Sequence, residues 1–173
     1  SIDGDTSPSD TVLLMANGLA GKEPIPLEIF QTALDQVCIH LAKAIARDGE
    51  GATKLIEVTV NGANSQTEAR LAARTIVSSP LVKAAVHGAD PNWGRIVVAV
   101  GRSGAEVVES KIDLNIGNVK ILKDGRPLPF DVASVIRVLK QDEVPINLHL
   151  NLGTASATAV SYTHLRAHET GRN

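Results

Sequence analysis

The segment of residues 47–54 places one carboxylate, that of Glu50, between Gly49 and Gly51. Glycine tolerates positive φ angles and carries no Cβ atom, so the backbone can turn sharply here and a small ligand can approach Glu50 closely. These residues therefore fit a site at which one acid contacts a substrate. The same pattern also fits a surface turn with an exposed acid, and on the local sequence alone we weigh the surface turn above the site.

A second segment rich in hydrogen-bonding groups covers residues 87–95 and contains Trp93, the only tryptophan. It leads directly into an apolar run, and polar side chains at the end of a strand can contact a substrate. Equally, residues 90–92 can build a turn, Trp93 can fill the core, and Arg95 can pair with an acid. We weigh this structural role above direct contact with substrate.

Helices and strands expected from the hydrophobic spacing would position both segments. Apolar residues spaced three and four apart from Leu27 to Ile45 predict a long, core-facing helix that ends at Gly49. Residues 54–60 are rich in β-formers and predict a strand. Residues 65–78 predict a helix, and residues 80–86 predict a second one with proline in its first turn. The inward face of the first of these two helices comprises Ala69, Ala72, Ala73, Ile76 and Val77.

The other expected elements complete a mixed order of helices and strands. A helix over residues 11–16 is capped by Asp10, and the apolar run of residues 95–100 predicts a central strand. Residues 118–122 begin a hairpin, whose Asp-Gly pair at residues 124–125 favours a type I′ turn. Asp131 caps a helix over residues 132–140, and residues 144–151 form the last strand. The sequence therefore predicts a single domain of the α/β class.

The composition excludes several classes of function. The 173 residues are 43% hydrophobic, enough for one core, whereas a net charge of −2 and 2% aromatic residues argue against nucleic acid as a partner. Cys38 is the only cysteine, and His40, His87 and His149 lack the spacing of metal ligands, so we expect no metal. No apolar run approaches the roughly 20 residues that cross a bilayer, and the polar opening is unlike a signal peptide. We expect a cytoplasmic protein without a membrane association.

From Val160 the composition of the sequence changes abruptly, because residues 160–170 contain two of the five histidines and the only tyrosine. Residues 160–170 resemble one reading frame of the mosaic-end adapter used in transposase-based sequencing libraries, and they include His164 and His168. We therefore expect residues 1–159 to be the evolved domain and residues 160–173 to be a non-native tail. A genuine polar extension is the alternative, in which the two histidines, four residues apart, could pass for metal ligands.

Three segments in order resemble the β chain of the ornithine acetyltransferases, the glutamate N-acetyltransferases of arginine biosynthesis. They are Ile-Asp-Gly-Asp-Thr-Ser at residues 2–7 with Asp-Thr-Val-Leu-Leu at 10–14, Asp-Gly-Glu-Gly-Ala-Thr-Lys at 48–54, and Asp-Pro-Asn-Trp-Gly-Arg at 90–95. The resemblance covers Ser1 to about Ala159, and three motifs in register make it specific. It implies an α/β fold, a layered αββα sandwich with helices over two stacked sheets, here incomplete at both ends.

The resemblance also implies a mechanism. A precursor cleaves itself into α and β chains, and the threonine exposed at the start of the β chain attacks the acetyl group of N-acetylornithine and passes it to glutamate. The α chain supplies the oxyanion hole, and the assembly is expected to be α2β2. No cofactor is implied, although acetyl-CoA is a second acetyl donor in bifunctional members. Glu50 matches the glutamate that binds the substrate amino acid, a carboxylate facing an ammonium group.

Departures from the family pattern limit what this chain is expected to do alone. The nucleophilic threonine is expected upstream of Ser1, residues 7–10 differ from the usual Ser-Thr-Asn-Asp, and residues from Val160 onward replace a segment that helps to bind substrate. We therefore expect no catalytic residue in this chain and no activity from it alone. Two alternatives stay open: Ser1 as an N-terminal nucleophile, and a non-catalytic binding or structural protein that keeps the fold.

Overall fold

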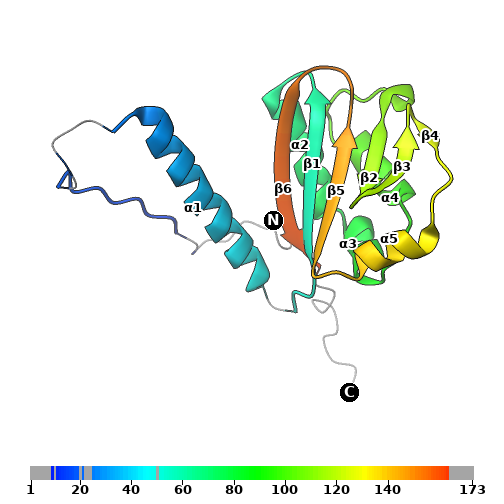
Figure 1. Cartoon of the computed structure of the whole chain (residues 1–173), viewed down its shortest axis with the longest axis horizontal. Helices are drawn as coiled ribbons and strands as arrows, with labels where there is room; N and C mark the ends of the chain where they lie inside the picture. The colour runs from blue at the N-terminus through cyan, green and yellow to red at the C-terminus, as the bar shows by residue number, and fades with distance from the viewer. Residues whose placement is uncertain (1–8, 10, 20, 22–24, 50, 164–173) are drawn as a thin grey trace.

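The computed structural model describes residues 9, 11–19, 21, 25–49 and 51–163, which form five helices, a 3-10 turn and six strands (Figure 1). In chain order they are α1 (Leu27–Arg47), β1 (Leu55–Ala63), α2 (Gln66–Ser78), α3 (Pro80–His87), α4 (Gly94–Gly101), η1 (Glu109–Lys111), β2 (Asp113–Ile116), β3 (Val119–Lys123), β4 (Arg126–Pro127), α5 (Val132–Leu139), β5 (Glu143–His149) and β6 (Ala155–Tyr162).

The strands form one mixed sheet in the order β4-β3-β2-β5-β1-β6. β1 runs parallel to β5 and antiparallel to β6, and the remaining pairs are antiparallel. The predicted α/β class is confirmed. Of the two stacked sheets that the family resemblance implies, the described part of the chain contains one.

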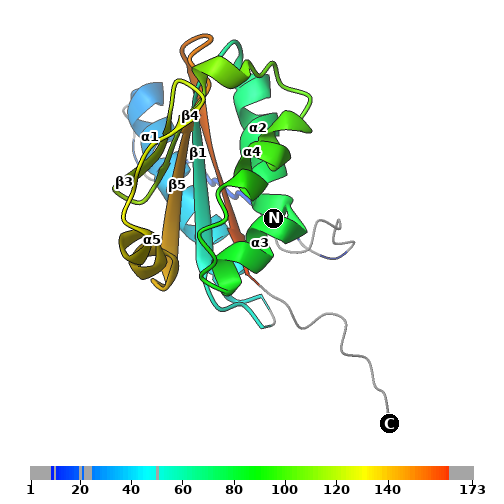
Figure 2. The same cartoon turned by 90° about the vertical axis from the view of Figure 1, so that its right-hand side faces the viewer.

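One face of the sheet carries the core. Helices α2, α3 and α4 lie on this face, as Figure 2 shows. Alternate residues of β1, Ile56, Val58 and Val60, are fully buried, as expected for the covered face of a strand. The buried residues of α2 are the five that the sequence predicts, and its first turn is capped by Ser65, whose Oγ accepts from the backbone N–H of Glu68 at 3.2 Å.

The opposite face of the sheet is more polar and carries less cover. The intervening residues of β1, Glu57 and Thr59, are half-buried, and the Thr59 hydroxyl lies 3.0 Å from that of Thr158 on β6. Helix α1 extends away from the sheet on this side (Figure 1). The predicted helix is confirmed, but its apolar stripe does not reach the core of this chain, because Ala46 is its only buried residue.

The prediction of a central strand over residues 95–100 is wrong, because these residues form α4. The buried residues Ile96, Ala99 and Val100 are spaced three and four apart, whereas Val98 is 64% exposed. A continuous apolar run fits a buried strand and a short helix equally well, so its spacing alone does not separate the two.

The predicted helix over residues 11–16 is also wrong, because these residues are irregular and exposed; its expected cap, Asp10, lies outside the described residues. A helix this short is marginal without a surface to bury its apolar side chains.

The predicted type I′ turn is confirmed, since Asp124 and Gly125 have φ angles of 49° and 71°. The cap of α5 is confirmed as well, since both carboxylate oxygens of Asp131 accept backbone N–H groups at 3.1 Å.

The domain boundary expected between Ala159 and Val160 falls inside β6. Val160, Ser161 and Tyr162 pair with β1, and the last two are buried. The fold therefore uses the chain beyond this boundary, whatever the origin of those residues, and a non-native origin of residues 160–173 stays a proposal. Residues 164–173, with His164 and His168, lie outside the described residues.

Candidate functional site

The predicted substrate-binding loop connects the end of α1 to the start of β1. Gly51 has a φ of 70°, and the N–H of Ala52 donates to the carbonyl oxygen of Gly49 at 3.0 Å, which closes a tight turn. The expectation that glycine supplies a positive φ angle is therefore confirmed at Gly51. Glu50 itself lies outside the described residues, so the substrate contact assigned to it stays a prediction.

The N-terminal arm of this loop is anchored to the end of β6. The Nε–H of Arg47 donates to the hydroxyl of Tyr162 at 3.0 Å, and this hydrogen bond raises the pKa of Arg47. Ala46, Leu55 and Tyr162 pack together in a small buried cluster beside this contact. The end of α1 is thus held although most of the helix is exposed.

The C-terminal arm is anchored to the residue that follows β6. The backbone N–H of Thr53 donates to Thr163 O at 3.0 Å, and the N–H of Thr163 donates to Lys54 O at 2.9 Å. The hydroxyls of the two threonines lie 2.7 Å apart, and the N–H of Lys54 donates to the Thr163 hydroxyl at 3.1 Å. Consecutive residues, Tyr162 and Thr163, therefore hold the two arms of the loop.

The side chain of Lys54 joins this arm to two helices. Its Nζ donates to Val86 O at 2.9 Å, to His87 O at 3.1 Å and to Leu139 O at 2.8 Å. Burial lowers the pKa of Lys54, and the nearby charge of Lys140 lowers it further. The sequence motif contains Lys54 but gives no signal for this role, because the three acceptors are backbone oxygens from two other elements.

The second predicted segment lies beside the first. The Nδ1 atom of His87 lies 3.2 Å from the hydroxyl of Thr53, so the structure brings the segments 48–54 and 87–95 together at the end of the sheet where β1 begins. Sequence reasoning did not pair them, since 34 residues separate the two side chains.

The turn from α3 to α4 has the structural role that the sequence favours. The guanidinium of Arg95 forms an ion pair with Asp90 at 3.6 Å and donates to Leu81 O at 3.0 Å. Trp93 packs against the core at the start of α4, and the N–H of Asp90 donates to Ala85 O at 2.8 Å. A contact between this turn and substrate stays a prediction.

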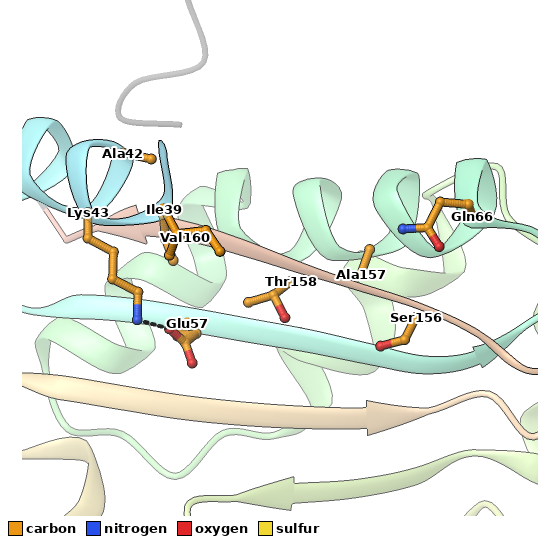
Figure 3. A pocket seen from close by; sticks show the side chains of 9 residues that line it. All are labelled: Ile39, Ala42, Lys43, Glu57, Gln66, Ser156, Ala157, Thr158 and Val160. Carbon is orange, nitrogen blue, oxygen red and sulfur yellow. Dashed lines mark ion pairs between the residues drawn. The ribbon is translucent and has the colours of Figure 1, made fainter. Parts of the chain in front are cut away.

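A groove of about 580 Å³ is lined by residues of α1, β1 and β6 and by Gln66 at the start of α2 (Figure 3). The ammonium of Lys43 on α1 reaches across it to the carboxylate of Glu57 on β1 at 2.5 Å. Their hydrogen bond is the main reason why the pKa of Lys43 is raised. The sequence gives no signal for this groove, because its walls come from four separate elements.

The described residues include no group of three or more His, Cys, Asp or Glu side chains that could hold a metal ion. Within the same part of the chain, no helix is both long and apolar enough to span a membrane. Ser1 and residues 2–7 and 10 of the first family motif lie outside the described residues, whereas residues 11–14 of that motif are irregular and exposed.

Comparison with known proteins identifies relatives over almost the whole chain. The arginine biosynthesis bifunctional protein ArgJ of Symbiobacterium thermophilum is 50% identical over 164 residues, which are 92% of this chain and 41% of that protein. A chloroplastic ArgJ of Sorghum bicolor is 44% identical over 94% of this chain and 37% of its own length. This chain thus spans about two fifths of the curated relatives that it matches.

A solved structure of an ArgJ protein also has the same fold as this chain. The crystal structure of ArgJ from Bacillus halodurans superposes with a TM-score of 0.91 at 45% identity, and the match covers 96% of this chain and 81% of that one. The ArgJ family model matches residues 1–164. Because the family model matches nearly the whole chain, this chain belongs to the ArgJ family.

Proposed function

We propose that this chain is part of a glutamate N-acetyltransferase of arginine biosynthesis, which moves the acetyl group of N2-acetylornithine to glutamate. The observation that carries the proposal is the match of the family model to residues 1–164. The anchored loop on either side of position 50 adds support, because a substrate-binding acid needs a fixed backbone to act on a small ligand.

The proposed reaction uses a threonine in the part of the precursor upstream of Ser1. Its hydroxyl oxygen attacks the acetyl carbonyl, the carbon–nitrogen bond breaks, and ornithine leaves with the proton while the acetyl group stays on threonine as an ester. The amino nitrogen of glutamate then attacks this ester, and the threonine hydroxyl is regenerated. The terminal amine acts as the base, and an oxyanion hole from the α chain stabilises both tetrahedral intermediates.

Within this scheme Glu50 binds the substrate and takes no part in bond making. Its carboxylate would face an ammonium group of the amino acid, since a charge-assisted hydrogen bond of this kind both attracts and orients a ligand. The hydrogen bonds of Arg47, Thr53 and Lys54 fix the backbone before and after position 50, which supports a role in orientation.

The partner that we propose is the α chain of the same precursor, in an α2β2 assembly. The exposed apolar side chains of α1 support a covering partner, because such a surface is unfavourable in water. They include Leu27, Ile29 and Ile39, with exposed fractions of 78%, 63% and 58%.

Acetyl-CoA is a second acetyl donor if the complete enzyme is bifunctional. A cytoplasmic location is part of the same proposal.

A hybrid precursor tests the proposal. Residues 1–163 of this chain, which include Tyr162 and Thr163, replace the matching segment of the Symbiobacterium relative, and the purified protein is incubated with N-acetylornithine. Mass spectrometry of its peptides should find an acetyl group on the threonine at the start of the β chain. The isolated chain should acquire none, whereas an acetyl group on Ser1 would establish the rival nucleophile.

The non-catalytic alternative is tested separately by sequencing the source DNA upstream of Ser1. A threonine at the expected cleavage site agrees with the proposal. An intact gene without this threonine would identify a binding or structural protein that keeps the fold.

A further inference from the structure

We propose that Lys54 is a positioning residue, through which the C-terminal ends of α3 and α5 hold the loop that carries Glu50. The inference rests on the proposed function, in which Glu50 binds the substrate ammonium group. In this proposal Lys54 makes no contact with the substrate and acts on the geometry of the loop.

The three hydrogen bonds of Lys54 use the full donor capacity of its ammonium group. An ammonium has three N–H donors and no acceptor, and Nζ has three carbonyl partners at 2.8–3.1 Å. Two of the carbonyls belong to Val86 and His87, the last residues of α3, and the third belongs to Leu139, the last residue of α5. One side chain thus joins two helix ends.

The chemistry of these acceptors suits a cation. The last carbonyl groups of a helix lack intrahelical partners and carry the negative end of the helix dipole. α3 and α5 both end beside the start of β1 (Figures 1 and 2), so their dipoles converge on Lys54. The three carbonyl oxygens satisfy the ammonium group at a position where burial lowers the pKa of Lys54.

The connection from Lys54 to the binding loop is short and rigid. Thr53 precedes it directly, and the backbone of both residues is hydrogen bonded to Thr163. The hydroxyl of Thr53 also contacts His87 of α3. A shift of Lys54 therefore moves the loop, and none of the loop residues that the structure describes is buried in the core.

The test is Lys54→Met in the hybrid precursor, with Lys140→Met as the matched control. Methionine keeps an unbranched apolar stem but has neither charge nor donors. Lys140 is an exposed lysine at the end of α5, so the control removes the same charge nearby and keeps the three hydrogen bonds. Thermal unfolding of each variant measures any general loss of stability.

Steady-state kinetics separate positioning from stability. We expect Lys54→Met to raise the KM for N-acetylornithine and to lower kcat/KM by about 10-fold to 100-fold, because small misplacements of a binding group are costly. A purely structural role would reduce the amount of active enzyme, and so the apparent kcat, with KM unchanged. Lys140→Met should have kinetics close to those of the unmodified hybrid.

A double-mutant cycle with Glu50→Gln tests whether Lys54 acts through Glu50. If it does, adding Lys54→Met to Glu50→Gln should change KM by less than about 2-fold, because coupled residues have non-additive effects. Additive effects, or an unchanged KM in Lys54→Met, would overturn the inference and leave the role of Glu50 intact. An unchanged KM in Glu50→Gln would overturn both.

If Lys54→Met does not fold, Lys54→Arg takes its place in the same cycle. The guanidinium keeps the positive charge, but its planar fork differs from the tripod of an ammonium, so fewer of the three carbonyls are satisfied. A smaller rise in KM, which disappears in the Glu50→Gln background, is the expected result. An unchanged KM in Lys54→Arg would contradict the inference.

Discussion

At the scale of single residues, Asp113 offers a test of the electrostatics of the fold. Its carboxylate accepts hydrogen bonds at 2.8 Å from both Lys123 Nζ and the backbone N–H of Asp124. Burial opposes ionisation of this group, but the two hydrogen bonds and the charge of Lys123 outweigh it and lower the pKa of Asp113.

The lowered pKa makes stability depend on pH in a defined direction. The contribution of Asp113 is present above the ordinary aspartate pKa of 3.8 and is lost as the pH falls through the lower pKa of the folded state. Urea unfolding of Asp113→Asn should show a loss of stability at pH 7 that shrinks toward pH 3. A difference that stays constant across this range would contradict the assignment.

Single residues also mark the limit of what the sequence predicts about the site. The glycines around position 50 predict a sharp turn, and Gly51 has the required φ angle. The anchors of that turn could not be predicted, because Lys54 binds backbone oxygens, and Tyr162 and Thr163 are more than 100 residues distant in sequence. Local composition carries no signal for such contacts.

At the scale of elements, the hairpin of β3 and β4 depends on Gly125. This residue has a φ of 71°, and a Cβ atom added to it would overlap the carbonyl oxygen of Glu109. Gly104 has a φ of 81° but has open space around its Cα. A side chain at either position would therefore strain the backbone, because both φ angles are positive. Only at Gly125 would the added Cβ atom also overlap another group.

Gly125→Ala and Gly104→Ala separate these two effects. The φ angle alone should cost about 1–2 kcal/mol of unfolding free energy at each position, and the overlap should make Gly125→Ala clearly more destabilising. Gly101→Ala, in open space without a positive φ, measures the effect of replacing glycine by alanine without either cost. Equal losses in the first two variants, measured by urea unfolding, would show that the overlap relaxes at no cost.

Elements differ in how well the sequence predicts them, and the reason is the length of the pattern. α2 has 13 residues with polar and apolar positions interleaved, so its period is clear and its buried face is predicted correctly. α4 has only eight residues, and Arg95 is the only one with a polar side chain, so the run has too few polar positions to reveal a helical period. Tertiary packing decides its conformation.

At the scale of the whole molecule, α1 is the least supported element. It has 21 residues and buries only Ala46, whereas α2 buries five residues against the sheet. Most helical stability in proteins comes from packing of an apolar face. The sequence predicts the helix and its apolar stripe correctly but cannot indicate whether the covering surface belongs to the same chain.

Amide hydrogen exchange tests the proposed covering of α1. In the isolated chain, the amides of α1 should exchange much faster than those of α2, because little buried surface opposes their opening. In the hybrid precursor, which restores the upstream part, α1 should become protected while α2 stays as it was. Equal protection of α1 with and without the upstream part would contradict the proposal that it covers this helix.

The most direct test of the central claim is the kinetic effect of Glu50→Gln in the hybrid precursor. Glutamine keeps the size of the side chain and removes the charge that would bind the substrate ammonium group. A lost charge-assisted hydrogen bond of about 1.5–3 kcal/mol should raise the KM for N-acetylornithine about 10-fold to 100-fold, with little change in thermal stability. Glu109→Gln removes an exposed acid in η1, toward the opposite end of the sheet, and should leave the kinetics unchanged. Unchanged KM and kcat in Glu50→Gln would contradict the role assigned to this loop.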